Sequence, residues 1–164
     1  MRSLIFCFVL LFSTQSQAQN TFPEQCIGVW EGTMYIYGGG QLRDSVRVRH
    51  TVKPIDKTIW TWKTEYLSEK LPMTKDYILR QQEPSIYVVD EGQNITIPMR
   101  QAGNKLYSVF EVQDILLTSS YELSNGQLIF EVISGKKNSE ANAQVGTYLI
   151  NAVQRVILKR KHNE

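Results

Sequence analysis

Short runs of alternating apolar and polar side chains, separated by turn residues, dominate the chain after residue 18. In one such run Val46, Val48 and His50 share a face, and the residues between them are polar. A two-residue period is typical of a β-strand with one buried face. No stretch of useful length shows the apolar period of a helix, so the helical crossovers that parallel strands require are missing. The sequence therefore predicts an all-β, antiparallel fold.

The residues between the runs favour hairpins. Asn125-Gly126 suits a type I′ turn, whose twist matches that of the strands beside it, and Gly38-Gly39-Gly40 permits positive φ. We predict one domain over residues 19–164 with ten strands joined as neighbours, at residues 28–37, 44–53, 58–67, 75–81, 85–90, 95–101, 105–112, 115–123, 127–133 and 145–159. The last strand is long, and its apolar face is ambiguous around Asn151-Ala152, which indicates a bulge.

A meander of this length has to protect its edge strands. We expect a single up-and-down β-barrel, in which closure removes the edges, and a two-sheet β-sandwich is the alternative. A closed barrel of about eight strands or more has room inside for a small ligand.

The N-terminus has the order of a secretory signal peptide. Arg2 supplies a positive charge, residues 4–12 form an unbroken apolar run, and Ser16-Gln17-Ala18 places small residues where signal peptidase cleaves. The apolar run is about half of the ~20 residues that a membrane-spanning helix needs. We predict a signal peptide at residues 1–18, cleavage after Ala18, and a periplasmic or extracellular product without a membrane span.

Net charge and cysteine content limit the kinds of partner and cross-link expected for this protein. The formal net charge of the whole chain is +2, which is too balanced to favour nucleic acid. Once the signal peptide is removed Cys26 is the one remaining cysteine, so no internal disulfide is expected. We interpret Cys26 as a small buried apolar residue rather than a reactive thiol.

The start of the predicted barrel resembles a known superfamily. Gly28-Val29-Trp30-Glu31-Gly32 is similar to the Gly-x-Trp start of the calycins, which include lipocalins, fatty-acid-binding proteins and nitrobindin-like barrels. The hairpin at residues 121–131 also resembles the nitrobindin-like pattern. The resemblance implies that Trp30 plugs one end of the barrel.

The ligands of these families do not carry over to this chain. Nitrobindin-like proteins hold haem through a His at the start of the last strand, and the corresponding position here lies near Val153, in a strand without His. The paired Arg and Tyr of fatty-acid-binding proteins cannot be placed. We therefore predict no cofactor.

Candidate site residues lie on the predicted inward faces. His50 is a candidate ligand contact, haem ligand or general base, although a hydrogen-bonded core histidine is the favoured interpretation. It lacks the companion ligands of a metal site, so no metal is predicted. Trp60, Trp62 and Tyr66 form an aromatic stripe that suits either ligand stacking or barrel core. The candidate ligand-binding set of the interior comprises Met34, Val48, His50, Trp60, Trp62, Tyr66, Phe110 and Phe130.

The predicted outer face of the barrel carries fewer candidate functional residues. Tyr35 and Tyr37 mark a contact surface, and we interpret the basic strip of Arg47, Arg49 and Lys53 as a solvated face. Glu31, Glu65 and Glu131 are scattered, without the spacing of an acid–base pair.

Two hypotheses follow. The first is an exported lipocalin-like barrel that binds a small apolar or amphipathic ligand in its interior. The second is a filled-core interaction or accessory module that acts on a protein partner in an envelope complex. Enzymatic activity ranks behind both, because no catalytic set is visible.

Overall fold

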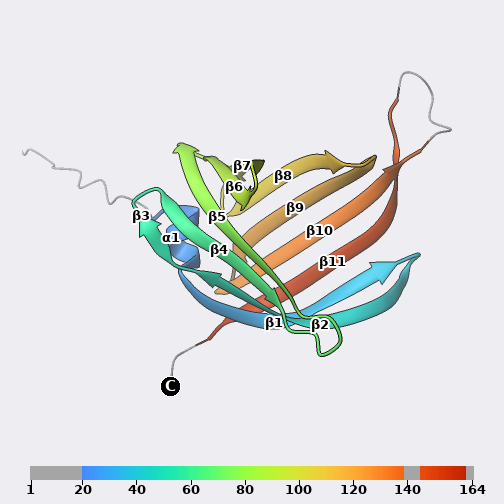
Figure 1. Cartoon of the computed structure of the whole chain (residues 1–164), viewed down its shortest axis with the longest axis horizontal. Helices are drawn as coiled ribbons and strands as arrows, with labels where there is room; N and C mark the ends of the chain where they lie inside the picture. Colours follow the sequence, from blue (N-terminus) through green and yellow to red (C-terminus); the bar gives the residue numbers. More distant parts are fainter. Residues whose placement is uncertain (1–19, 139–144, 162–164) are drawn as a thin grey trace, which may run out of the picture.

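Ten antiparallel strands close into a barrel, and one short extra strand lies at its margin (Figure 1). The computed structural model describes residues 20–138 and 145–161. The elements are α1 (Phe22–Cys26), β1 (Gly28–Gly38), β2 (Gln41–Val52), β3 (Pro54–Asp56), β4 (Ile59–Tyr66), β5 (Met73–Glu83), β6 (Ile86–Gly92), β7 (Ile95–Ala102), β8 (Lys105–Val112), β9 (Ile115–Ser124), β10 (Gln127–Lys137) and β11 (Tyr148–Arg160). The predicted signal peptide at residues 1–18 lies outside the described residues.

Two pairings close the ladder. From β4 to β11 each strand pairs with the next along the chain, β11 pairs with β1, and β2 pairs with β4 past the small β3. The predicted antiparallel barrel is thus confirmed, and the two-sheet alternative is excluded. The bulge is confirmed as well. In the pairing of β10 with β11, Ser134 lies opposite Ala152 but Gly135 lies opposite Ile150, so Asn151 is the extra residue.

Two short elements escaped prediction. Residues 54–57 lie between two predicted strands, but Pro54–Asp56 form β3, which folds back on β4 with Pro54 opposite Trp60. The five-residue α1 is too short to show a helical period. It does carry the local signal of a helix start, because Thr21 and Glu24 form a capping box and Pro23 lies in the first turn.

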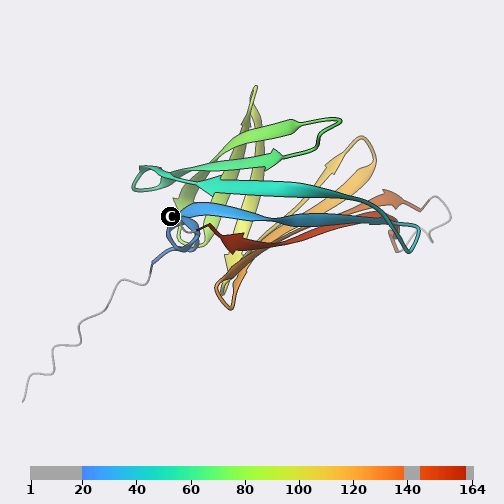
Figure 2. The same ribbon diagram turned by 90° about the horizontal axis from the view of Figure 1, so that it is seen from below.

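The end of the barrel beside α1 is closed by side chains. Figures 1 and 2 both show α1 at one end of the barrel. Trp30 is fully buried and donates its indole N–H to the Cys26 carbonyl at 2.7 Å. The Arg160 guanidinium lies over the Trp30 ring, 4.3 Å from its centroid. Cys26 is completely buried, which confirms its predicted role as a small core residue, and burial raises the pKa of its thiol.

The opposite end of the barrel is less tightly paired. In the register of β7 with β8 three positions are matched, from Arg100–Tyr107 to Ala102–Lys105. Pro98, which has no N–H to donate, lies in the part of β7 beyond that register. The β2–β4 ladder likewise matches four positions. The β7–β8 and β2–β4 pairs therefore separate most easily toward this end of the barrel.

A glycine in β1 allows the closing strands to meet. A Cβ on Gly32 would overlap the main-chain oxygen of Ile157 and come within 3.0 Å of Val156 Cγ2. We therefore expect Gly32→Ala to force β1 and β11 apart and to lower the free energy of unfolding by about 2 kcal/mol, with a drop in melting temperature of roughly 5 °C.

Thermal unfolding followed by circular dichroism measures the loss. Gly146→Ala is the matched control, because no atom lies within 4 Å of a Cβ there. Equal melting temperatures for the two variants would show that the β1–β11 approach is not tight.

Candidate functional site

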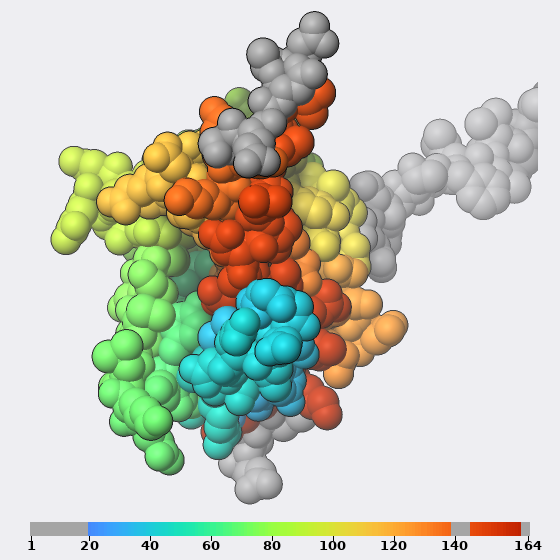
Figure 3. Space-filling model, turned by 90° about the vertical axis from the view of Figure 1, so that its right-hand side faces the viewer, coloured from blue at the N-terminus to red at the C-terminus, as the bar shows by residue number. Residues whose placement is uncertain are grey.

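The less tightly paired end of the barrel opens into a pocket of about 690 Å³. Ile36, Val46 and Tyr66 reach it from β1, β2 and β4. The loop between β4 and β5 contributes Leu67 and Leu71, and Leu71 is 78% exposed. Figure 3 views this end directly and shows a recess between the green β4–β5 segment and the red β11. We call this pocket the mouth.

Inward-facing side chains change from partly exposed to fully buried along the barrel. Of the partly buried apolar group, Ile27 and Leu123 are found near α1, and the members nearer the mouth are Ile36, Val46, Tyr66, Tyr77, Ile97 and Val132. Deeper side chains such as Met34, Val48 and Leu79 are at most 1% exposed. The interior is therefore a cup that is open at the mouth and filled beside α1.

Aromatic rings form the floor of the cup. Tyr121 and Phe130 stack with centroids 4.4 Å apart and planes 10° from parallel. Trp62 meets Tyr121 edge to face at 5.0 Å, and His50 meets Trp62 in the same way at 4.8 Å. These rings come from β2, β4, β9 and β10, so the floor joins both sides of the barrel.

His50 lies within this floor as a neutral imidazole. Its Nδ1 is 2.9 Å from the Thr64 hydroxyl oxygen, whereas its Nε2 has no hydrogen-bond partner among the described residues. Burial lowers the pKa of His50 from 6.5 to about 3. Thus one ring nitrogen is bonded as expected for a core histidine, and the other is not.

Polar groups surround the upper part of the cup. Lys75 and Tyr77 lie opposite Thr64 and Trp62 in the β4–β5 register, and directly paired residues share a face, so both side chains point inward. Burial and the carboxylate of Glu91 raise the pKa of Tyr77. Lys75 Nζ lies 5.9 Å from the Tyr77 ring centroid. No ion pair joins Lys75 to another residue in the described ranges.

The candidate residues divide between the cup and the filled core. His50, Trp62 and Phe130 belong to the floor, Tyr66 lines the mouth, and Phe110 is partly buried on β8 toward the same end. Met34, Val48, Trp60 and Trp30 are fully buried.

Sequence reasoning missed three residues. Tyr121 was missed because it follows residues 115–117, an apolar run in which the alternation of apolar and polar side chains is lost. Lys75 and Glu91 also lie at inward positions, but the apolar period could not reveal them because their side chains are charged. Continuing the alternation of Leu79 and Tyr77 back to Lys75 is the one signal that points inward.

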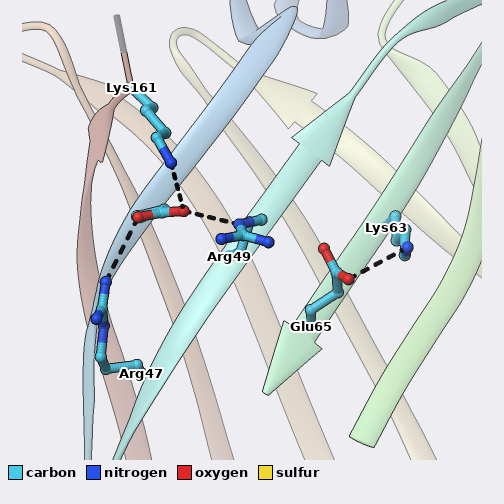
Figure 4. A network of polar contacts seen from close by, with 6 residues as sticks. Arg47, Arg49, Lys63, Glu65 and Lys161 are labelled. Atoms are coloured by element: carbon cyan, nitrogen blue, oxygen red, sulfur yellow. Dashed lines mark hydrogen bonds and ion pairs between the residues drawn. The ribbon is translucent and has the colours of Figure 1, made fainter. Parts of the chain in front are cut away.

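The predicted basic strip is partly neutralised. Figure 4 shows Arg47, Arg49 and Lys161 converging on one carboxylate. That carboxylate belongs to Glu31, which accepts from Arg49 Nε at 2.7 Å and lies 3.5 Å from Arg47 and 3.6 Å from Lys161. The hydrogen bond from Arg49 holds the pKa of Glu31 below its usual range. Glu31 therefore ties β1 and β2 to Lys161, the residue after β11.

A second, smaller pocket lies on the outer wall. It measures about 380 Å³ and is lined by Tyr35, Tyr37 and Ile157 among others. Tyr35 and Tyr37 are exposed, as the alternation predicted.

The part of the chain that the structure describes shows neither a cluster of metal ligands nor a membrane-spanning helix. Over residues 20–138 and 145–161, no three His, Cys, Asp or Glu side chains gather to hold a metal. The helix found within those ranges is too short to cross a membrane.

Comparison with known proteins identifies the fold. No protein-family model matches the sequence, and no curated protein matches it. Among solved structures, the S-type phycobiliprotein lyase CPES of Guillardia theta has a TM-score of 0.59 at 10% identity, covering 87% of this chain and 92% of that one. The fold is calycin-like.

Two further structures are similar. Rv2717c of M. tuberculosis has a TM-score of 0.52 at 13% identity, covering 84% of this chain and 94% of that protein. A mutant of the fluorescent protein UnaG has a TM-score of 0.49 at 15% identity, covering 85% of this chain and 99% of its own. The barrel fold predicted from the sequence is confirmed by its similarity to the lyase CPES and to Rv2717c.

The neutral, buried His50 predicts how stability depends on pH. The unfolded chain binds a proton at this histidine below about pH 6.5, whereas the folded chain does so only near pH 3. The unfolded state therefore binds more protons in between, and stability falls as the pH falls. We expect His50 to contribute on the order of 1 kcal/mol per pH unit to this loss.

Urea unfolding between pH 6.5 and 5 measures this slope, in a range where most carboxylates stay ionised. His50→Gln removes the titrating group and is expected to flatten the profile. An unchanged slope in the variant would mean that the folded protein protonates His50 readily.

Proposed function

We propose that this protein is a carrier or receptor that binds a small amphipathic molecule in the cup. The gradient of burial along the interior is the observation that supports this most directly. Inward-facing Ile36, Val46 and Tyr66 remain partly exposed, whereas side chains deeper in the barrel such as Met34, Val48 and Leu79 are fully packed. The mouth volume of about 690 Å³ lies within the range of small-molecule sites.

The chemistry of the cup favours an amphipathic ligand. Aliphatic and aromatic side chains form its wall and floor, and they suit an apolar body. Lys75 and Glu91 lie nearer the mouth and suit a polar end. The calycin-like fold is compatible with this function, and one protein of similar fold is named as a phycobiliprotein lyase.

A substitution that fills the mouth tests the proposal. The fluorescent probe phenylnaphthylamine is apolar and brightens on leaving water, so it reports on an accessible apolar site. We expect Val46→Trp, which places an indole in the mouth, to weaken probe binding about tenfold or more, a loss of roughly 1.4 kcal/mol.

The matched control is Val109→Trp, the same change at a position 63% exposed on β8. It is expected to bind the probe as the natural protein does. If both variants bind equally well, the probe does not occupy the mouth and the proposal fails.

We also propose that the barrel works outside the cytoplasm, after removal of residues 1–18. The apolar run and the small residues before position 19 support this. Intact mass spectrometry of the protein recovered from its own host should give a mass that begins at Gln19. A mass that begins at Met1 would contradict export through this signal.

The interaction module remains a second candidate because of the outer pocket. Exposed Tyr35, Tyr37 and Ile157 form an apolar patch beside Arg155 and Lys159, a composition found at protein interfaces. Native mass spectrometry of the same sample separates the two functions. A bound small molecule supports the carrier, whereas a stable protein complex that is lost in Tyr35→Ser supports the module.

A further inference from the structure

Two polar atoms in the floor of the cup are buried without partners. The side chains of His50 and Trp62 are each 1% exposed, and neither His50 Nε2 nor Trp62 Nε1 has a hydrogen-bond partner at normal bond length among the described residues. Their rings meet edge to face with centroids 4.8 Å apart, so both atoms belong to one small region. Buried polar groups are nearly always hydrogen-bonded, and an exception calls for a functional or structural reason.

This region lies one side chain below the space of the cup. Tyr121 contacts both rings, at 5.0 Å from Trp62 and 5.4 Å from His50. Tyr121 and Phe130 point inward and are 7% exposed, so they are buried less completely than His50 and Trp62. The Tyr121 hydroxyl interacts with Thr64 and Trp62 by longer, weak hydrogen bonding that lowers its pKa, although burial raises that pKa overall. A ligand that reaches the two nitrogens therefore has to displace Tyr121.

We propose that His50 and Trp62 form a subsite for an uncharged oxygen, a carbonyl or hydroxyl, at the inner end of the ligand. This rests on the proposed binding of a ligand in the cup. The indole N–H of Trp62 is a donor only, so the ligand atom must accept. His50 Nε2 supplies a second donor when Thr64 donates to Nδ1, and an acceptor when Nδ1 donates to Thr64. A carbonyl matches the first arrangement and a hydroxyl matches the second.

The surroundings require that this oxygen carry no charge. The floor consists of aromatic rings and Thr64, and no ion pair of the described residues includes any of them. A carboxylate or ammonium there would lose its water without gaining an opposite charge. Charged groups face the interior higher up, at Lys75 and Glu91. The ligand therefore enters with its uncharged oxygen first and leaves any charged end at the mouth.

Three naphthalene probes of similar size test the subsite: methyl naphthyl ketone, ethylnaphthalene and naphthoate. Each is measured by its displacement of phenylnaphthylamine from the purified protein. The ketone should bind about tenfold more tightly than the hydrocarbon, because it satisfies a buried donor that the hydrocarbon leaves unpaired. In Trp62→Phe, which keeps an aromatic ring and removes the N–H, this preference should fall below about threefold.

Trp60→Phe is the matched control, since Trp60 is equally buried two residues away on the same inward face of β4. It should keep the preference for the ketone. Naphthoate should bind equally well to the natural protein and to Trp62→Phe, because its charge holds it at the mouth. A larger loss for naphthoate than for the ketone would overturn the requirement for an uncharged oxygen.

The outcomes separate the subsite from the function on which it rests. If no probe displaces phenylnaphthylamine, ligand binding in the cup fails and the subsite fails with it. If the ketone and the hydrocarbon displace it equally well, the cup binds ligands but His50 and Trp62 hold at most a water molecule. If Trp62→Phe fails to fold, His50→Phe is used in its place. The ratio of ketone to hydrocarbon affinity in the natural protein already decides between these results.

Discussion

Closure of the hydrogen-bonded ladder is the constraint on which the rest of this structure depends. β11 returns to β1, with Trp30 opposite Arg160 at one end and Gly38 opposite Ala152 at the other. Because side chains alternate across a strand, closing the ladder assigns every second residue to a single shared interior. His50 and Trp62 on one side of the barrel then meet Tyr121 on the other.

The two ends of the barrel differ in how tightly their elements are joined. Beside α1, Arg160 covers the Trp30 ring and donates hydrogen bonds to the carbonyl oxygens of Gln25 and Ile27. Outside the same end, Glu31 gathers three basic side chains from β2 and from the residue after β11. These contacts join segments far apart in the sequence and hold the filled end together. At the mouth the β4–β5 loop spans residues 67–72 and the β7–β8 register is short, so local opening is easiest at this end.

The floor of the cup combines strong packing with incomplete polar satisfaction. Stacked and edge-to-face rings bury large apolar surfaces and define the floor geometrically. The unpartnered nitrogens of His50 and Trp62 reduce the stability that this packing supplies. Such a compromise is common where a site is prepared for a group that arrives from outside the protein. Under the proposed function, the apolar wall shapes the cup and these polar atoms supply its selectivity.

Local sequence was sufficient for the strands, their antiparallel pairing and the inward direction of His50 and Trp62, because a two-residue period acts within one strand. Turn chemistry such as Asn125-Gly126 identified neighbouring strands, and the bulge at Asn151 was visible as a break in the period. The missed elements, α1 and β3, are shorter than any period that could reveal them. The cup itself was beyond the sequence. Whether an inward side chain is packed or borders open space depends on what stands opposite it, and for Tyr66 or Tyr121 those neighbours come from strands distant along the chain. Only the closed barrel brings them together.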